Sequence, residues 1–134
     1  MANKREVKQK IDELQLRRKD ATKGGGTDRV DAQHSRGKLT ARERINILMD
    51  DGSFQEIDSF VTLSSYKFDP STQNTPSEAV VTGYGKINGK TVFIYAQDFT
   101  VFGGSLSEVV AQKICKVMDI AIQNGAPIVG LIDS

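Results

Sequence analysis

The alternation of apolar and polar positions sets a charged first segment apart from the apolar remainder of the chain. In residues 3–20 only Val7, Ile11 and Leu14 recur at helical spacing, among Lys, Arg, Glu and Gln. This pattern predicts a solvated helix with one thin apolar edge. We expect the helix to be an arm that packs on its own domain or on a neighbouring subunit. A nucleic-acid arm is the weaker alternative, because acidic residues interrupt the positive charge.

A glycine run and a second helix follow this segment. Gly24-Gly25-Gly26 predicts a mobile joint. It does not fit a P-loop, which needs a preceding strand and a following Gly-Lys-Ser/Thr. Thr40 and Glu43 fit a capping box, which predicts a helix that stops near Asp51-Gly52. Its inward side chains are expected to be Ile45, Leu48 and Met49.

The middle of the chain has strand patterns. Residues 53–63 are strand-like, and the polar turn formers of 64–77 predict a surface loop. Two apolar runs, 79–87 and 90–99, flank Asn88-Gly89, which is the strongest short signal for a β-hairpin because both turn residues must accept positive φ. The second run is apolar on both faces and is therefore expected to be a central, buried strand.

The last third of the chain predicts a helix between two parallel strands. Between residues 106 and 124, apolar residues recur three and four positions apart, which predicts a helix of about five turns. Ser105 and Glu108 fit a capping box at its start, and Gly125 and Pro127 end it. Another apolar run follows, so a βαβ unit with a right-handed crossover is expected.

Composition gives only a broad indication of the class of protein. The chain has 134 residues, 38% of them hydrophobic and 26% charged, and a net charge of +1. These values fit one domain with a modest core and argue neither for nor against nucleic acid. There is no signal peptide and no apolar run near the roughly 20 residues that cross a bilayer, so we expect a cytoplasmic protein. The chain stops within an apolar strand pattern, which suggests a fragment of a longer protein.

The single cysteine and the single histidine offer little chemistry. Cys115 lies beside the helical stripe and is expected to be a small packed side chain. One cysteine cannot form an intrachain disulfide, which weakly favours a reducing compartment. His34 has no second histidine near it, so a hydrogen-bonded structural role is expected rather than a metal site. Nucleophilic catalysis has little support, because the chain has no Gly-x-Ser-x-Gly elbow.

The best positional clue is the edge where the two parallel strands end. Residues 98–104 and Asp133-Ser134 follow these strands, and ligands of open α/β sheets bind at such ends. Gly103-Gly104 allows close approach to the backbone, and the helix start beyond it offers N–H groups for a phosphate or a polarised carbonyl. A tight turn with glycine for steric relief is the alternative that spacing leaves open, and Asp98 fits either an acid–base or a turn role. A basic group could meet phosphates or form an ion-paired helix face, and it comprises Arg36, Lys38, Arg42 and Arg44.

Three segments carry a family resemblance. GGGTDRVDAQHSRGKLTARERINILMDDGSF, VVTGYGKINGKTVFIYAQDFTVFGGSLSE and AQKICKVMDIAIQNGAPIVGLIDS closely resemble the carboxyltransferase β subunit of biotin-dependent acyl-CoA carboxylases, nearest to the propionyl-CoA type. The resemblance covers nearly all of residues 22–134. It implies an α/β, crotonase-like (ClpP/crotonase) superhelix of ββα units. Residues 1–22 would be a charged helical arm, and 23–134 the beginning of the N-terminal domain, truncated at its C-terminal end.

The resemblance also implies an activity in fatty acid metabolism. The family transfers a carboxyl group from carboxybiotin to the α-carbon of a short acyl-CoA such as propionyl-CoA, giving methylmalonyl-CoA. Biotin sits on a biotin carboxyl carrier protein and is charged by a biotin carboxylase, and the full-length subunit commonly forms a hexamer. Alternatives are a methylmalonyl-CoA decarboxylase α subunit, a transcarboxylase subunit, and a non-catalytic fragment that serves only folding or assembly. A membrane sodium-pumping partner would favour the decarboxylase. No nucleic-acid partner is implied.

Site residues are implied by position. The residues that match the strand exit lining the acyl-CoA pocket are Phe99, Thr100, Val101, Phe102, Gly103 and Gly104. Asp133-Ser134 match the start of an Asp-Ser-Gly-Gly-Ala-Arg turn whose glycine N–H groups resemble an enolate-binding oxyanion hole. These glycines are expected just after Ser134, so the chain itself would hold no catalytic residue and no metal, and would be inactive alone. Ser107 departs from a glycine common in relatives, and we expect the helix's first turn to tolerate it. Gly104→Val is expected to place a side chain in the pocket.

Overall fold

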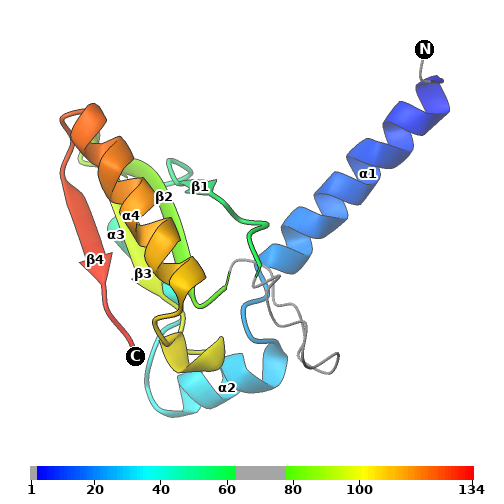
Figure 1. The fold of residues 1–134 in the computed structure, drawn as a ribbon. Helices are drawn as coiled ribbons and strands as arrows, with labels where there is room; N and C mark the ends of the chain where they lie inside the picture. The colour runs from blue at the N-terminus through cyan, green and yellow to red at the C-terminus, as the bar shows by residue number, and fades with distance from the viewer. Residues whose placement is uncertain (1–2, 63–77) are drawn as a thin grey trace.

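The computed structural model describes residues 3–62 and 78–134. In this part of the chain a sheet, several helices and a projecting N-terminal helix are found (Figure 1). The elements in chain order are α1 (Lys4–Ala21), α2 (Thr27–Ser35), α3 (Ala41–Leu48), β1 (Gln55–Ile57), β2 (Val80–Ile87), β3 (Lys90–Gln97), the 3-10 turn η1 (Phe102–Gly104), α4 (Glu108–Gln123) and β4 (Ile128–Leu131). The surface loop predicted at 64–77 lies outside the described residues.

The sheet has the predicted hairpin and the predicted parallel pair. Its strand order is β1-β2-β3-β4, with β3 antiparallel to β2 and parallel to β4. Asn88 and Gly89 have φ of 51° and 78°, which is the positive-φ turn that Asn-Gly predicts. The strand expected over 53–63 is shorter, because only Gln55–Ile57 pairs with β2. The βαβ unit is therefore confirmed, with β3 as the central strand.

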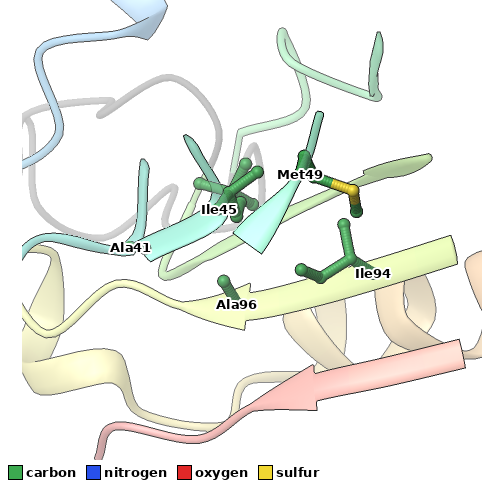
Figure 2. Close-up of a cluster of buried hydrophobic side chains, with 6 residues drawn as sticks. Ala41, Ile45, Met49, Ile94 and Ala96 are labelled. Atoms are coloured by element: carbon green, nitrogen blue, oxygen red, sulfur yellow. The ribbon is translucent and has the colours of Figure 1, made fainter. Parts of the chain in front are cut away.

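Helices cover both faces of the central strand. Ile94 and Ala96 of β3 face α3, where they meet the buried Ile45 and Met49 (Figure 2). Phe93, one position away, points to the other face and packs against Val117 of α4. Successive side chains of a strand alternate between faces, so two covered faces explain why this strand is apolar throughout.

The two predicted capping boxes had different outcomes. At α3, the Thr40 hydroxyl accepts from the Glu43 N–H at 3.3 Å, and the Glu43 carboxylate accepts from the Thr40 N–H at 2.7 Å, as predicted. At α4 the prediction is wrong, because the N-cap is Ser107, whose hydroxyl accepts from the Val110 N–H at 3.1 Å. Ser105 directly follows the η1 turn, and its hydroxyl donates to the Phe102 carbonyl instead of capping α4. Ser107, which we expected the first turn only to tolerate, is therefore the N-cap of α4.

Three further expectations are corrected. Cys115 is exposed rather than packed, because its place on α4 lies just off the buried stripe. Leu106 is 69% exposed, since the helix begins after it. The glycine run is not a loose joint: the Gly25 N–H donates to the Thr100 hydroxyl at 3.0 Å, and a Cβ at Gly25 would collide with the Thr100 carbonyl oxygen.

Helix α2 was not predicted. Its sequence, TDRVDAQHS, holds one strongly apolar residue, Val30, so no apolar period marks it. Gly26 precedes it with φ of 93° and no side-chain cap. The helix nevertheless positions several side chains at the candidate site. Among the described residues, no helix has the length and apolarity to cross a bilayer.

Candidate functional site at the exit of β3

The side chain of Gln97 ties the two strand exits together. Its amide N–H group donates to the Gly104 carbonyl at 3.1 Å, and its amide oxygen accepts from the Asp133 N–H at 3.2 Å. Gln97 ends β3, Gly104 ends the η1 turn, and Asp133 follows β4. The prediction that residues 98–104 and Asp133-Ser134 share one edge of the sheet is confirmed.

A buried aspartate builds the first half of the turn. Asp98 is 4% exposed. Its carboxylate accepts from the Thr100 N–H at 3.0 Å and from the Thr100 hydroxyl at 2.5 Å. The same hydroxyl accepts from Gly25, so the carboxylate, the turn and the glycine run form one connected network. Of the two roles that the sequence left open for Asp98, its contacts support the turn role.

The second half of the turn has left-handed backbone. Phe102, Gly103 and Gly104 have φ of 47°, 64° and 67°. Phenylalanine rarely adopts this conformation, which costs on the order of 1 kcal/mol, and such residues cluster at functional sites. Phe102 itself is 51% exposed.

The six residues predicted to line a pocket separate into two groups. A hollow of about 320 Å³ is bordered by Phe99, Thr100, Phe102 and Gly103. Val101 is 1% exposed and packs in the core against α4 instead. Gly104 faces the segment after β4, because a Cβ there would meet the Asp133 carbonyl oxygen, whereas a Cβ at Gly103 would meet nothing within 4 Å. Gly104→Val therefore disturbs the strand exit rather than the hollow.

The opposite wall of the hollow comes from α2, which supplies Arg29, Ala32 and Gln33, and from Arg36 at the C-cap of that helix. The Arg29 guanidinium donates to the Thr100 carbonyl at 3.4 Å. The Arg36 guanidinium lies 5.8 Å from the centre of the Phe99 ring, and the Lys38 ammonium lies 5.4 Å from it. Arginines with open N–H groups beside aromatic rings suit a ligand that carries phosphate and a flat ring system.

Sequence reasoning found Arg36 and Lys38 but missed Arg29 and Gln33. The only local signal for the helix that carries them is Asp28, because an acidic residue is typical of a first helical turn. Of the predicted basic group, Arg42 is already paired with Glu56 at 2.6 Å and also bonds the Ala21 carbonyl. Arg42 therefore has the ion-paired role that the sequence left open as an alternative to phosphate binding.

Asp133 is held by side chains from two other parts of the chain. Its carboxylate accepts from Gln33 at 2.9 Å and from Lys38 at 2.9 Å. Partial burial acts to raise the pKa of Asp133, but the Lys38 and Gln33 hydrogen bonds outweigh it and leave the pKa below its ordinary value. Together with the Gln97 bond, these contacts fix the backbone that leads into Ser134.

His34 has the structural role expected of it. Its Nε2 lies 2.9 Å from the Glu43 carboxylate, next to the α3 cap. The hydrogen bond from His34 is the largest cause that lowers the pKa of Glu43. Within the described ranges, no cluster of three His, Cys, Asp or Glu side chains has the arrangement of a metal site.

These features define a class of protein before any relative is considered. A βαβ unit has helices on both faces, and a glycine turn lies beside a basic, aromatic hollow at the strand exit, which is the edge where α/β proteins commonly bind their ligands. Residues 32–134 match the carboxyl transferase domain family. The chain belongs to this family.

The relatives include subunits of a carboxylase and of a decarboxylase. The chain is 54% identical over 128 residues to a propionyl-CoA carboxylase carboxyltransferase subunit of Haloferax mediterranei, a match that covers 96% of this chain and 25% of that protein. It is 50% identical over 125 residues to a methylmalonyl-CoA decarboxylase subunit alpha of Propionigenium modestum, covering 93% and 24%. The chain therefore spans about a quarter of the length of these relatives.

A solved structure confirms the fold. The hexameric transcarboxylase 12S core, with methylmalonyl-coenzyme A bound, superimposes with a TM-score of 0.90 at 38% identity, covering all of this chain and 26% of that one. The crotonase-like α/β fold predicted for the chain is confirmed.

Proposed function

We propose that the protein containing this chain transfers a carboxyl group from carboxybiotin to the α-carbon of a short acyl-CoA, giving methylmalonyl-CoA from propionyl-CoA. The observation that carries the proposal is the basic, aromatic-lined hollow at the exit of β3 in a chain of the carboxyl transferase domain family. The 54% identity to a propionyl-CoA carboxylase subunit supports the choice of a short acyl group.

The part of the reaction assigned to this chain is acyl-CoA binding. Coenzyme A carries an adenine ring and several phosphate groups. The rings of Phe99 and Phe102 supply apolar faces beside the hollow, and the guanidinium groups of Arg29 and Arg36 supply charge that phosphates can meet. Gly103 leaves the floor of the turn open. Binding at this edge uses backbone and fixed side chains and needs no nucleophile.

The carboxyl transfer itself requires groups beyond those described. Carboxybiotin, on a carrier protein loaded by a biotin carboxylase, would supply the carboxyl group, and we assign no described residue to biotin. We expect enolate-stabilising N–H groups directly after Ser134, as the family resemblance implies. The contribution of this chain is to position that segment, because Gln33, Lys38 and Gln97 all bond Asp133. We further propose a hexamer for the full-length subunit and a cytoplasmic location, consistent with one exposed free cysteine.

Calorimetric titration of propionyl-CoA into the chain tests the binding assignment. Replacing both Arg29 and Arg36 by alanine is expected to weaken binding at least ~10-fold, since each charge-assisted contact contributes on the order of 1 kcal/mol or more. The matched control, Arg17→Ala and Arg18→Ala, removes two cations from α1 and should leave the affinity unchanged. An equal loss of affinity in both double variants would show that the net charge of the chain, and not the hollow, determines binding.

The reaction is tested with the full-length subunit, its carrier protein and a biotin carboxylase. Formation of methylmalonyl-CoA from propionyl-CoA and bicarbonate, dependent on ATP, is the expected result. A decarboxylase is the second candidate, favoured by the 50% identity to a decarboxylase subunit. Loss of CO₂ from methylmalonyl-CoA without any ATP-dependent carboxylation would establish that alternative.

A further inference from the structure

The N-terminal helix α1 leaves an apolar edge uncovered. Val7, Ile11 and Leu14 are 46%, 49% and 40% exposed, and they line a shallow hollow along the helix. The helix projects away from the sheet and its covering helices (Figure 1). None of the chemistry proposed above uses it.

The edge follows a coiled-coil repeat. Spacings alternate between three and four residues along Lys4, Val7, Ile11, Leu14, Arg18 and Ala21. Such a seam repeats every 3.5 residues on average and is suited to pairing with another helix. At 18 residues the helix is about 27 Å long, which is long enough for two to three heptads.

The positions beside the seam carry only positive or neutral side chains. They are occupied by Lys8, Lys10, Gln15 and Arg17. The acidic residues of the helix lie outside these positions, although Glu13 bonds Lys10 at 3.3 Å and Arg17 at 2.7 Å from the side. Exposed ion pairs of this kind are weak, so both cations can also meet a partner's carboxylates.

Charge opposes pairing between two copies of the helix. In an antiparallel pair that places Ile11 of one copy opposite Leu14 of the other, Lys10 of each copy would lie beside Arg17 of the other. In a parallel pair, Lys4 and Arg18 would each meet their own equivalents. Like charges at such positions select against a pairing. A nucleic acid would match the charge but would leave the apolar seam without a counterpart.

We propose that α1 docks through its apolar edge against an amphipathic helix of another protein. On that partner helix, the positions beside the apolar edge are acidic. The apolar seam supplies the buried contact, and the basic flanks select the partner and its register. The inference stands on the exposure and charge pattern of α1 alone and does not depend on the proposed carboxyl transfer.

The test uses a fluorescent helical peptide of about three heptads with leucine at the seam and glutamate at the flanking positions. The control peptide carries lysine in place of each glutamate. Anisotropy is measured while the chain is titrated to about 1 mM, at about 50 mM and about 500 mM salt. We expect the glutamate peptide to bind with a Kd of roughly tens of micromolar, at least ~10-fold more tightly than the lysine peptide and less tightly at high salt.

Variants separate the seam from the rest of the helix. Ile11→Asp should abolish binding, while Leu16→Asp, at an exposed position on another face of α1, should leave it unchanged. Reversing Lys8, Lys10 and Arg17 to glutamate should transfer the preference to the lysine peptide. Circular dichroism confirms that each variant keeps its helix content.

Four results would overturn the proposal. They are equal binding of the two peptides, no binding of either at the highest concentration, a dimer of the chain in sedimentation that Ile11→Asp dissolves, and complete competition by a short DNA duplex. The third result would assign the edge to a second copy, and the fourth to nucleic acid.

Discussion

Helices α1 and α4 both carry apolar residues three and four positions apart, and they have opposite environments. On α4, Val110 and Val117 are 0% exposed against the sheet, whereas on α1 the corresponding edge is 40–49% exposed. The difference comes from their connections. α4 joins two parallel strands, so its crossover must lie on the sheet. Within residues 3–62 and 78–134, α1 meets the body at its C-terminal end, where Ala21 is buried and its carbonyl accepts from Arg42. Periodicity shows which face is apolar, and connectivity determines what covers it.

The largest expected effect separates the two helices directly. Val117→Asp places a charge in a fully buried site beside Phe93, and it should cost more than about 4 kcal/mol or prevent folding. Ile11→Asp makes the same kind of change on the exposed edge of α1 and should change the free energy of unfolding by less than about 0.5 kcal/mol. Urea unfolding monitored by circular dichroism compares them. Equal destabilisation would show that the body covers the α1 edge.

The second prediction concerns a lysine on the buried face of α4. Lys113 is 3% exposed, and its ammonium donates to the Val80 carbonyl at 2.8 Å. Burial is the main cause that lowers its pKa from 10.5 to about 8, although Glu56 and Asp58 act in the opposite direction. Between pH 8 and 10.5 the unfolded chain thus binds more protons at this site than the folded one. The free energy of unfolding should therefore rise with pH in this window, by up to about 3 kcal/mol.

Urea midpoints measured across this pH range test the effect. Lys113→Met should remove the rise, because the methionine has no proton to lose. The matched control is Lys116→Met, on the same helix but half-exposed and paired with Asp58 at 2.8 Å, which should keep the rise. An unchanged pH dependence in Lys113→Met would assign the effect to other groups.

The elements that sequence predicted are those whose signals are local. Asn88-Gly89 specifies its own turn, and Thr40 and Glu43 satisfy each other's backbone groups three residues apart. The parallel pair followed from the order of a strand, a helix and a strand. In the turn and the cap, residues close in sequence carry the whole physical reason for the structure, and in the parallel pair the order of neighbouring elements carries it.

What sequence did not predict depends on contacts between distant segments. Gly25 is fixed by Thr100, and Asp133 is held by Gln33 and Lys38, about a hundred residues away. No local pattern contains these pairs. The sequence therefore predicted the shared strand exit at the end of β3, but it missed the wall that α2 builds beside that exit and the outward direction of Cys115. Acyl-CoA binding by Phe99, Phe102 and Gly103 stays a prediction.

The third prediction examines the junction of arm and body. Gly25→Ala would push a methyl group into the Thr100 carbonyl, and we expect a loss of about 2 kcal/mol. Gly37→Ala is the control: nothing lies within 4 Å of the added Cβ, but φ is +73°, so only backbone strain of about 1 kcal/mol is expected. Urea unfolding measures both. A smaller loss of stability in Gly25→Ala than in Gly37→Ala would instead support the mobile joint that the sequence predicted.

The smallest expected effect compares the same capping motif in the two regions. Thr40 and Glu43 cap α3, and Asn3 and Glu6 cap α1 with the same reciprocal bonds. Because α3 covers the central strand, Thr40→Ala should lower the free energy of global unfolding by about 1 kcal/mol, and Thr40→Ser should restore most of it. Asn3→Ala should leave global unfolding unchanged and only speed amide hydrogen exchange in the first turns of α1. A loss at Asn3 equal to that at Thr40 would mean that α1 unfolds together with the body, and the contrast between the two helices would then be one of exposure alone.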